Sequence, residues 1–199
     1  MEELLEVKPE IVACDMHPSY NTRAAAEEMG LPVFPVQHHY AHILSCMAEN
    51  EWTTKKKVIG VSFDGTGYGT DGTIWGGEIL LADYDSFKRW GCIEPFAQTG
   101  GDASAKEGWR IAVSLLGKIY GKEIALSLIE TLGLCESKLA KLQFTMEERG
   151  INTVKSTSAG RLFDAVSAIL GIRKASTFEG EASTCLLYTS PSPRDLSTS

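Results

Sequence analysis

Two spacings of apolar residues alternate along this chain, and together they predict a mixed α/β fold. Compact apolar runs bounded by Gly, Asp or Pro predict strands, and apolar residues repeated at three- and four-residue spacing predict amphipathic helices. The predicted strands or extended stretches cover residues 11–14, 31–36, 58–63, 74–82 and 83–96. The predicted helices cover residues 2–8 (the end of a helix), 22–29, 37–49, 105–119, 122–134, 137–149 and 160–170, with loops at 64–73, 98–103 and 153–159.

The loop between the apolar runs 58–63 and 74–82 is rich in glycine, and it joins one strand to the next. Its first residues are Gly65, Thr66, Gly67, Tyr68 and Gly69. Glycines let backbone N–H groups approach a phosphate closely, so these residues are candidates for nucleotide binding. Dinucleotide-binding and Walker loops open a helix instead, so both are disfavoured. The phosphate-binding hairpin of the actin and sugar-kinase superfamily has this arrangement; a glycine-rich hairpin that merely turns is the alternative.

Three of the four histidines fall in the segment Gln-His-His-Tyr-Ala-His, residues 37–42. His38 and His42 are four apart, so on a helix their imidazoles lie on one face, one turn apart, and could share a metal ion. Histidines that only hydrogen-bond their neighbours are the alternative. Asp64, at the end of the next strand, could supply a third ligand if the strand lies beside the helix. Two imidazoles and a carboxylate suit iron or zinc.

A second candidate anion site precedes the predicted helix 160–170. Ser158 and Gly160 lie where a Ser/Thr-rich loop meets the helix start, and Asp164 follows one turn later. Backbone N–H groups at a helix start attract anions, so all three are candidate nucleotide-binding residues. An ordinary capped helix explains the same pattern equally well.

Composition indicates an ordinary globular protein and excludes several classes. The 199 residues are 43% hydrophobic and 23% charged, with a formal net charge of -7. This acidic balance predicts no binding to nucleic acid or to an anionic membrane. No apolar run approaches the ~20 residues that span a bilayer, and the acidic N-terminus does not resemble a signal peptide. The five cysteines are scattered, which fits a reducing cytoplasm; Cys14 and Cys46 are expected to be small buried hydrophobic residues.

Five motifs together resemble the HypF carbamoyltransferases of nickel–iron hydrogenase maturation. They are Val-Ala-Cys-Asp-Met-His-Pro (12–18), Pro-Val-Gln-His-His-Tyr-Ala-His (35–42), the glycine-rich hairpin from Phe-Asp-Gly-Thr-Gly to Trp-Gly-Gly-Glu (63–78), Gly-Gly-Asp-Ala (100–103) and Gly-Arg-Leu-Phe-Asp-Ala-Val (160–166). The resemblance covers residues 1–184, in the family's order. Residues 185–199, with two prolines and no periodicity, look instead like a translated sequencing adapter.

The resemblance implies an actin-like ATPase (ASKHA) fold similar to the TsaD threonylcarbamoyl transferases. It also implies an enzyme that makes carbamoyl adenylate from carbamoyl phosphate and ATP and passes the carbamoyl group to the C-terminal cysteine of the partner HypE. The metal ligands carried over are His38, His42 and Asp64, and residues 65–69 would cradle the nucleotide phosphates. No residue of the chain need act as a covalent nucleophile, because the attacking thiol comes from HypE.

Departures from the family pattern lead us to expect a TsaD-like domain that is truncated at both ends. The family's acylphosphatase-like domain, zinc-finger cysteines and YrdC-like domain have no counterpart here, and its final acidic metal ligand should follow the sequence given. The chain alone is therefore expected to be inactive. The alternatives are a threonylcarbamoyl or O-carbamoyl transferase of the same fold, an actin-fold kinase, or a truncated product without activity.

Overall fold

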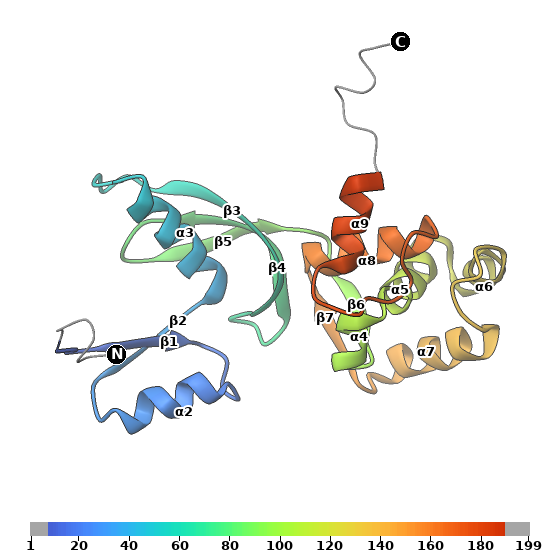
Figure 1. The fold of residues 1–199 in the computed structure, drawn as a ribbon, viewed down its shortest axis with the longest axis horizontal. Helices are drawn as coiled ribbons and strands as arrows, with labels where there is room; N and C mark the ends of the chain where they lie inside the picture. Colours follow the sequence, from blue (N-terminus) through green and yellow to red (C-terminus); the bar gives the residue numbers. More distant parts are fainter. Residues whose placement is uncertain (1–7, 190–199) are drawn as a thin grey trace, which may run out of the picture.

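The computed structural model describes residues 8–189 and places their elements in two groups side by side (Figure 1). The N-terminal group contains β1 (Val12–Asp15), α2 (Asn21–Glu28), β2 (Val33–Val36), α3 (His38–Glu49), β3 (Val58–Tyr68), β4 (Ile74–Ala82) and β5 (Phe87–Cys92). The C-terminal group contains β6 (Phe96–Thr99), α4 (Asp102–Lys106), α5 (Gly108–Tyr120), α6 (Lys122–Thr131), α7 (Ser137–Arg149), β7 (Thr153–Ser156), α8 (Ala159–Ile169) and α9 (Glu181–Thr189). The helix end predicted at residues 2–8 lies outside the described residues except for its last position.

The first three elements form a strand–helix–strand unit that delivers the chain to α3. β1 and β2 pair in parallel, with Asp15 opposite Val36. A parallel pair needs a crossover connection, and α2 supplies it. Because α3 begins two residues after Val36, the end of β1 lies beside the first turn of α3. The strands and helices predicted for this part of the chain are confirmed to within about two residues.

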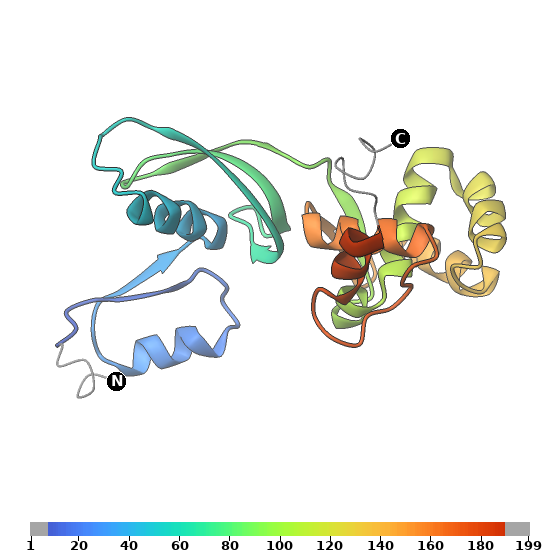
Figure 2. The ribbon, with the colours of Figure 1, turned by 45° about the horizontal axis from the view of Figure 1, so that its top comes forward.

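The glycine-rich stretch is mostly strand, which corrects the loop predicted over residues 64–73. β3 continues to Tyr68 and pairs with β4 in antiparallel fashion, so the tight turn covers only residues 69–73. The ladder is interrupted between Phe63 and Gly67, where the register shifts. Such a bulge bends a strand and re-aims its side chains, and here it contains Asp64. Figure 2 shows α3 lying against one side of this curved hairpin.

The C-terminal group is built around α5 and α8, which contact each other. Their buried residues, among them Ile111, Val113, Ala165 and Ala168, form one apolar core with parts of α6 and α7. A separate apolar cluster, with Tyr40, Ile43, Met47, Trp75, Leu80 and Ala82, packs α3 onto the hairpin. β6 and β7 pair with each other, and β7 meets β4 at Ile74 and Ser156, so one sheet path runs β3–β4–β7–β6.

Several predicted boundaries in this half are wrong for identifiable reasons. The loop predicted at 153–159 begins with β7, a strand too short and polar to stand out in the sequence. The strand predicted at 83–96 is only β5, because Pro95, which has no N–H for a ladder, separates β5 from β6. β6 begins at Phe96 and occupies the start of the loop predicted at 98–103, and α4 begins at Asp102 near its end. The helix predicted at 105–119 is interrupted at Glu107, and the helix predicted at 122–134 ends at Thr131.

The segment from residue 185, predicted to be adapter-derived and not part of the fold, begins inside a helix, because α9 runs from Glu181 to Thr189. Residues 190–199 lie outside the described residues, so the adapter origin of 185–199 stays a prediction. In the described part of the chain, no helix combines the length and apolar character that crossing a bilayer requires.

Candidate metal centre

The start of α3 places two imidazoles on one side of the helix. Gln37 caps the helix, because its side-chain carbonyl accepts a hydrogen bond of 2.9 Å from the Tyr40 N–H. This cap fixes the first turn, so His38 and His42 follow one another at helical spacing. Their Nε2 atoms are 3.2 Å apart, and both rings are partly exposed, His42 more than His38.

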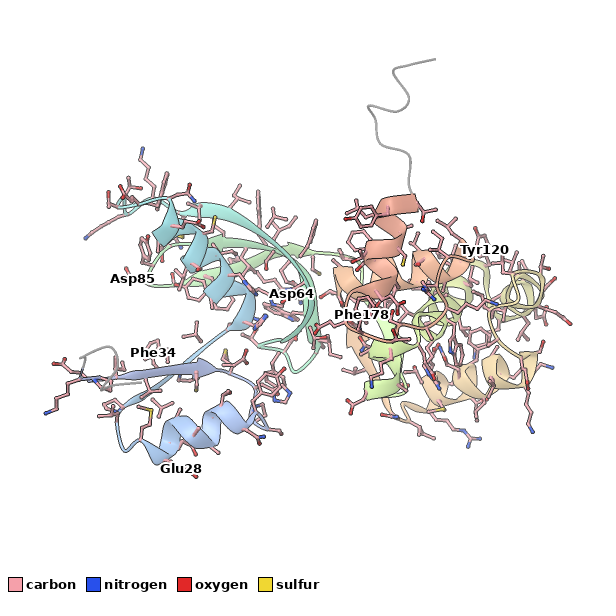
Figure 3. All side chains as sticks on the ribbon, in the orientation of Figure 1. Glu28, Phe34, Asp64, Asp85, Tyr120 and Phe178 are labelled. Carbon is pink, nitrogen blue, oxygen red and sulfur yellow. The ribbon has the colours of Figure 1, made fainter. Side chains whose placement is uncertain are left out.

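Asp64 completes the cluster from the bulge of β3, as Figure 3 shows where α3 faces the hairpin. Its Oδ2 lies 2.7 Å from His38 Nε2 and 3.6 Å from His42 Nε2. One ligand atom from each residue lies within 4.8 Å of the others, so a single ion could contact all three. The expected neighbourhood of Asp64 and the histidine helix is therefore confirmed. That the three residues hold a metal stays a prediction.

The charge on Asp64 favours a cation. Burial opposes ionisation of this carboxyl, but a hydrogen bond of 2.6 Å from the Gly65 N–H, together with His38, holds its pKa below the ordinary value. The carboxylate is therefore ionised at neutral pH. Two imidazole nitrogens and one carboxylate oxygen make a donor set suited to zinc or ferrous iron, so these residues fit the metal that the family resemblance implies.

His39, between the two cluster histidines, has a different role. Its ring is fully buried, and its Nδ1 lies 3.1 Å from the Gln37 Nε2. Burial, together with the nearby His38, lowers the pKa of His39 to about 4, so the ring is neutral at pH 7. His39 lies in the contact between α3 and the hairpin, and it is not among the three ligand candidates.

The five loop residues predicted to bind phosphate divide into two kinds. Gly67 and Gly69 are buried: a Cβ on Gly67 would lie 2.4 Å from His39 Cε1, and one on Gly69 would lie 2.3 Å from Trp75 Nε1. Tyr68 is half-buried against His17. Thr66 is exposed, and no atom of the described chain lies within 4 Å of a Cβ built on Gly65. Packing thus accounts for Gly67 and Gly69, and Gly65 and Thr66 keep open space for a ligand.

In the second candidate group, at the start of α8, Ser158 and Gly160 contact this loop and Asp164 does not. Ser158 is buried; it caps α8 by accepting from the Arg161 N–H and donates its hydroxyl to the Gly65 carbonyl at 2.5 Å. Gly160 also approaches Gly65, since its Cβ would lie 3.0 Å from the Gly65 Cα. Asp164 is instead buried in an ion pair of 2.9 Å with Arg161. The phosphate-binding role of these residues stays a prediction.

Two features of the site were not anticipated from the sequence. Asp15 contacts the opposite edge of the His38 ring, with its Oδ2 3.1 Å from His38 Nδ1. The acid at the end of a strand, in Asp-Met-His-Pro, was the available signal. Cys46, expected to be buried, is exposed one turn beyond His42, where it lines an open hollow together with residues of β3.

Known proteins are similar to this chain over nearly its whole length. Residues 60–193 match the family described as "Carbamoyltransferase, Kae1-like Domain, second subdomain", and residues 1–49 match the "HypF Kae1-like domain". The chain belongs to the HypF carbamoyltransferase family. It is 39% identical over 179 residues to the carbamoyltransferase HypF of Rhizobium leguminosarum bv. viciae, which covers 90% of this chain and 23% of the relative. The HypF of Rhodobacter capsulatus is 40% identical over 185 residues, covering 90% of this chain and 24% of that protein.

Solved HypF structures have the same fold. A crystal structure of full-length HypF in its phosphate- and nucleotide-bound form superposes with a TM-score of 0.84 at 39% identity, covering 93% of this chain and 24% of that one. The structure of T. kodakarensis HypF gives a TM-score of 0.76 at 34% identity, over 89% of this chain and 24% of that one. The predicted actin-like, TsaD-like α/β fold and membership in a family of transferases are therefore confirmed. The chain spans about a quarter of the length of these relatives.

Proposed function

We propose that this chain contributes the carbamoyl-transfer site of a HypF-type enzyme. The substrate is carbamoyl adenylate, made from carbamoyl phosphate and ATP, and the acceptor is the C-terminal cysteine thiol of HypE. The observation that supports this proposal is the convergence of His38 Nε2, His42 Nε2 and an Asp64 oxygen within 4.8 Å of one another. We place the reaction in the cytoplasm, where the thiols of both proteins stay reduced.

In this reaction the acceptor sulfur forms a bond to the carbamoyl carbon, and the bond between that carbon and the phosphate oxygen of AMP breaks. AMP leaves with the bonding electrons, and the thiol proton is lost to solvent. His38, His42 and Asp64 would hold a divalent metal, iron or zinc, which when bound polarises a carbonyl or phosphoryl oxygen. The acceptor thiol comes from the partner, so the exposed Cys46 is not needed as a nucleophile.

The adenylate would lie along the open side of the hairpin. The Gly65 N–H is already bonded to Asp64, so the exposed Thr66 and the start of α8 are the remaining donors on this side. α8 begins at Ala159, and Gly160 brings its first turn against Gly65. Backbone N–H groups at the start of a helix of this length favour an anion such as the phosphate of AMP.

The competing functions differ in whether they need the two histidines as metal ligands. A threonylcarbamoyl or O-carbamoyl transferase of the same fold would use the same metal centre with another acceptor. An actin-fold kinase holds magnesium mainly with carboxylates and phosphates and does not need two imidazoles. The His38–His42 pair therefore favours a transferase over a kinase.

Metal binding tests the site on which this proposal rests. The metal-free protein is titrated with zinc or, without oxygen, with ferrous iron, in competition with a chromophoric chelator. One equivalent per chain is expected, and His38→Ala or His42→Ala should lower the affinity at least about tenfold, because each removes one ligand of three. His17→Ala, a histidine outside the cluster, is the matched control and should bind as the wild type does. A wild-type protein that binds no better than the His38→Ala, His42→Ala double variant would contradict the proposal.

A further inference from the structure

Asp15 lies on the far side of His38 from the proposed metal position. The His38 ring is held between two carboxylates: its Nδ1 is 3.1 Å from Asp15 Oδ2, and its Nε2 is 2.7 Å from Asp64 Oδ2. We propose that Asp15 is a positioning residue, which fixes the tautomer and the direction of the His38 ring so that Nε2 presents its lone pair to the metal. This inference rests on the metal centre of the proposed function.

The tautomer of His38 follows from the hydrogen bonds that a carboxylate can make. An ionised carboxylate has no proton to donate, so it can bond the His38 Nδ1 only by accepting an N–H from it. Without a metal, the ionised Asp64 accepts a proton from Nε2 in the same way, at 2.7 Å. A cation bound between Nε2 and Asp64 replaces that proton, and the bond to Asp15 then keeps the remaining proton on Nδ1 and leaves the Nε2 lone pair to the metal. A carboxylate that bonds the second nitrogen of a ligating histidine also makes that histidine a stronger ligand.

The backbone holds Asp15 in this orientation. Its other oxygen, Oδ1, accepts a hydrogen bond of 2.8 Å from the His17 N–H. The strand end itself is fixed, since Asp15 pairs with Val36 in the β1–β2 ladder and the Met16 N–H donates to the Val36 carbonyl at 3.2 Å. The side chain is only 18% exposed. Asp15 thus has one oxygen on the backbone and the other on His38, and rotation would break both bonds.

This double acceptor role makes asparagine an informative replacement. Asparagine has nearly the same shape but one acceptor oxygen and one NH₂ donor. If the oxygen still accepts from the His17 N–H, the NH₂ faces His38 Nδ1 and favours the tautomer with the proton on Nε2. The Nε2 atom then has no lone pair for a metal. If the amide turns over, the NH₂ meets the His17 N–H and that bond is lost. Either arrangement weakens the presentation of the His38 lone pair.

The test compares zinc affinity in Asp15→Asn with that in Asp85→Asn. Asp85 is an exposed acid in the turn between β4 and β5, which Figure 3 labels away from Asp64, so it controls for the lost charge. Asp15→Asn should bind zinc about 10- to 100-fold more weakly than the wild type, the usual cost of removing such a partner. Asp85→Asn should bind within about twofold of the wild type, because it keeps every group that touches the cluster. Thermal unfolding without metal shows whether each variant is folded.

Nitrogen NMR of the His38 ring supplies a second, independent measurement on the zinc-bound wild type. Zinc on Nε2 with a proton on Nδ1 is expected, and zinc on Nδ1 would overturn the inference even if Asp15→Asn did not fold. Equal zinc affinity in wild type and a folded Asp15→Asn would overturn it too, while leaving the proposed metal centre intact. A wild type that binds no zinc or iron would overturn the proposed function and this inference together.

Discussion

Two carboxylates on the same hairpin, Asp64 on β3 and Glu78 on β4, have opposite surroundings. The Glu78 side chain is fully buried, and both its oxygens are occupied: Oε1 accepts from the Gly76 and Gly77 N–H groups and from Thr157, and Oε2 accepts from Arg89 at 2.7 Å. Asp64 is 32% exposed, and its contacts are the cluster histidines and the Gly65 N–H. Glu78 is enclosed and has no room for a ligand, whereas Asp64 is open to solvent and its Oδ2 faces two imidazoles with which it could share a cation.

The surroundings of Glu78 form a scaffold that ties three parts of the chain together. The Arg89 guanidinium, from β5, bonds both Glu78 on β4 and Asp71 in the turn, at 2.7 Å and 3.1 Å. It also lies 4.1 Å above the centre of the Trp75 ring. The attraction of a buried ion pair and its further hydrogen bonds offset the cost of removing both charges from water, and removing one partner leaves the other charge uncompensated. The two carboxylates should therefore respond very differently to substitution.

The largest effect is expected at Glu78. Glu78→Ala should lower the free energy of unfolding by about 3–5 kcal/mol, because it leaves two buried backbone N–H groups and the Thr157 hydroxyl without their acceptor and removes one of the two carboxylates that pair with Arg89. Asp64→Ala in metal-free protein should cost less than about 1 kcal/mol, because that side chain is partly solvated and its loss buries no unpaired charge. Urea denaturation of both variants in the presence of a chelator measures the difference. Equal losses would show that Asp64 is as much a part of the scaffold as Glu78.

A smaller effect should separate the two kinds of glycine in β3. Gly67→Ala places a methyl group 2.4 Å from His39 Cε1, so α3 and the hairpin must move apart. Overpacking of this kind costs about 1–3 kcal/mol, and zinc affinity should fall as well because the shift separates His38 from Asp64. Gly65→Ala meets no described atom within 4 Å and should change stability by less than about 0.5 kcal/mol. Equal stabilities for the two variants, measured by urea denaturation, would contradict this division.

The site was more predictable than its surroundings. Helical spacing alone placed His38 and His42 on one face. Asp64 was a third ligand only on the condition that its strand lies beside the helix, and the strand does not end there but continues to Tyr68. The bulge that turns Asp64 toward the helix could not be foreseen, because it depends on how β3 pairs with β4. The same limit hid Asp15, which reaches His38 only because β1 and β2 pair in parallel.

The fold shows a similar division between local and long-range information. Strong local patterns gave α3 and α7 nearly to the residue. β7 escaped detection because four residues of Thr-Val-Lys-Ser carry little apolar periodicity, and their strand pairing with β6 is a tertiary contact. The glycines of β3 show the same limit. Gly67 and Gly69 suggest a loop in the sequence, but their close packing against His39 and Trp75 explains why both positions are glycine.

The smallest expected effect concerns acid sensitivity of the scaffold at Asp71. Burial opposes ionisation of this carboxyl, but hydrogen bonds from Thr73 and Trp75, together with Arg89, hold its pKa below the ordinary value. A pKa lowered by folding stabilises the folded protein above the unfolded pKa of about 4, and this contribution is lost as the pH falls through the folded pKa. Asp71→Asn should therefore lower the urea midpoint at pH 7, and the gap to the wild type should close as the pH falls through the lowered pKa of Asp71. Asp85→Asn, in the next turn of the sheet, is the control and should follow the wild type throughout this pH range. A gap for Asp71→Asn that stays constant across this range would mean that its effect comes from the shape of the turn and not from the charge.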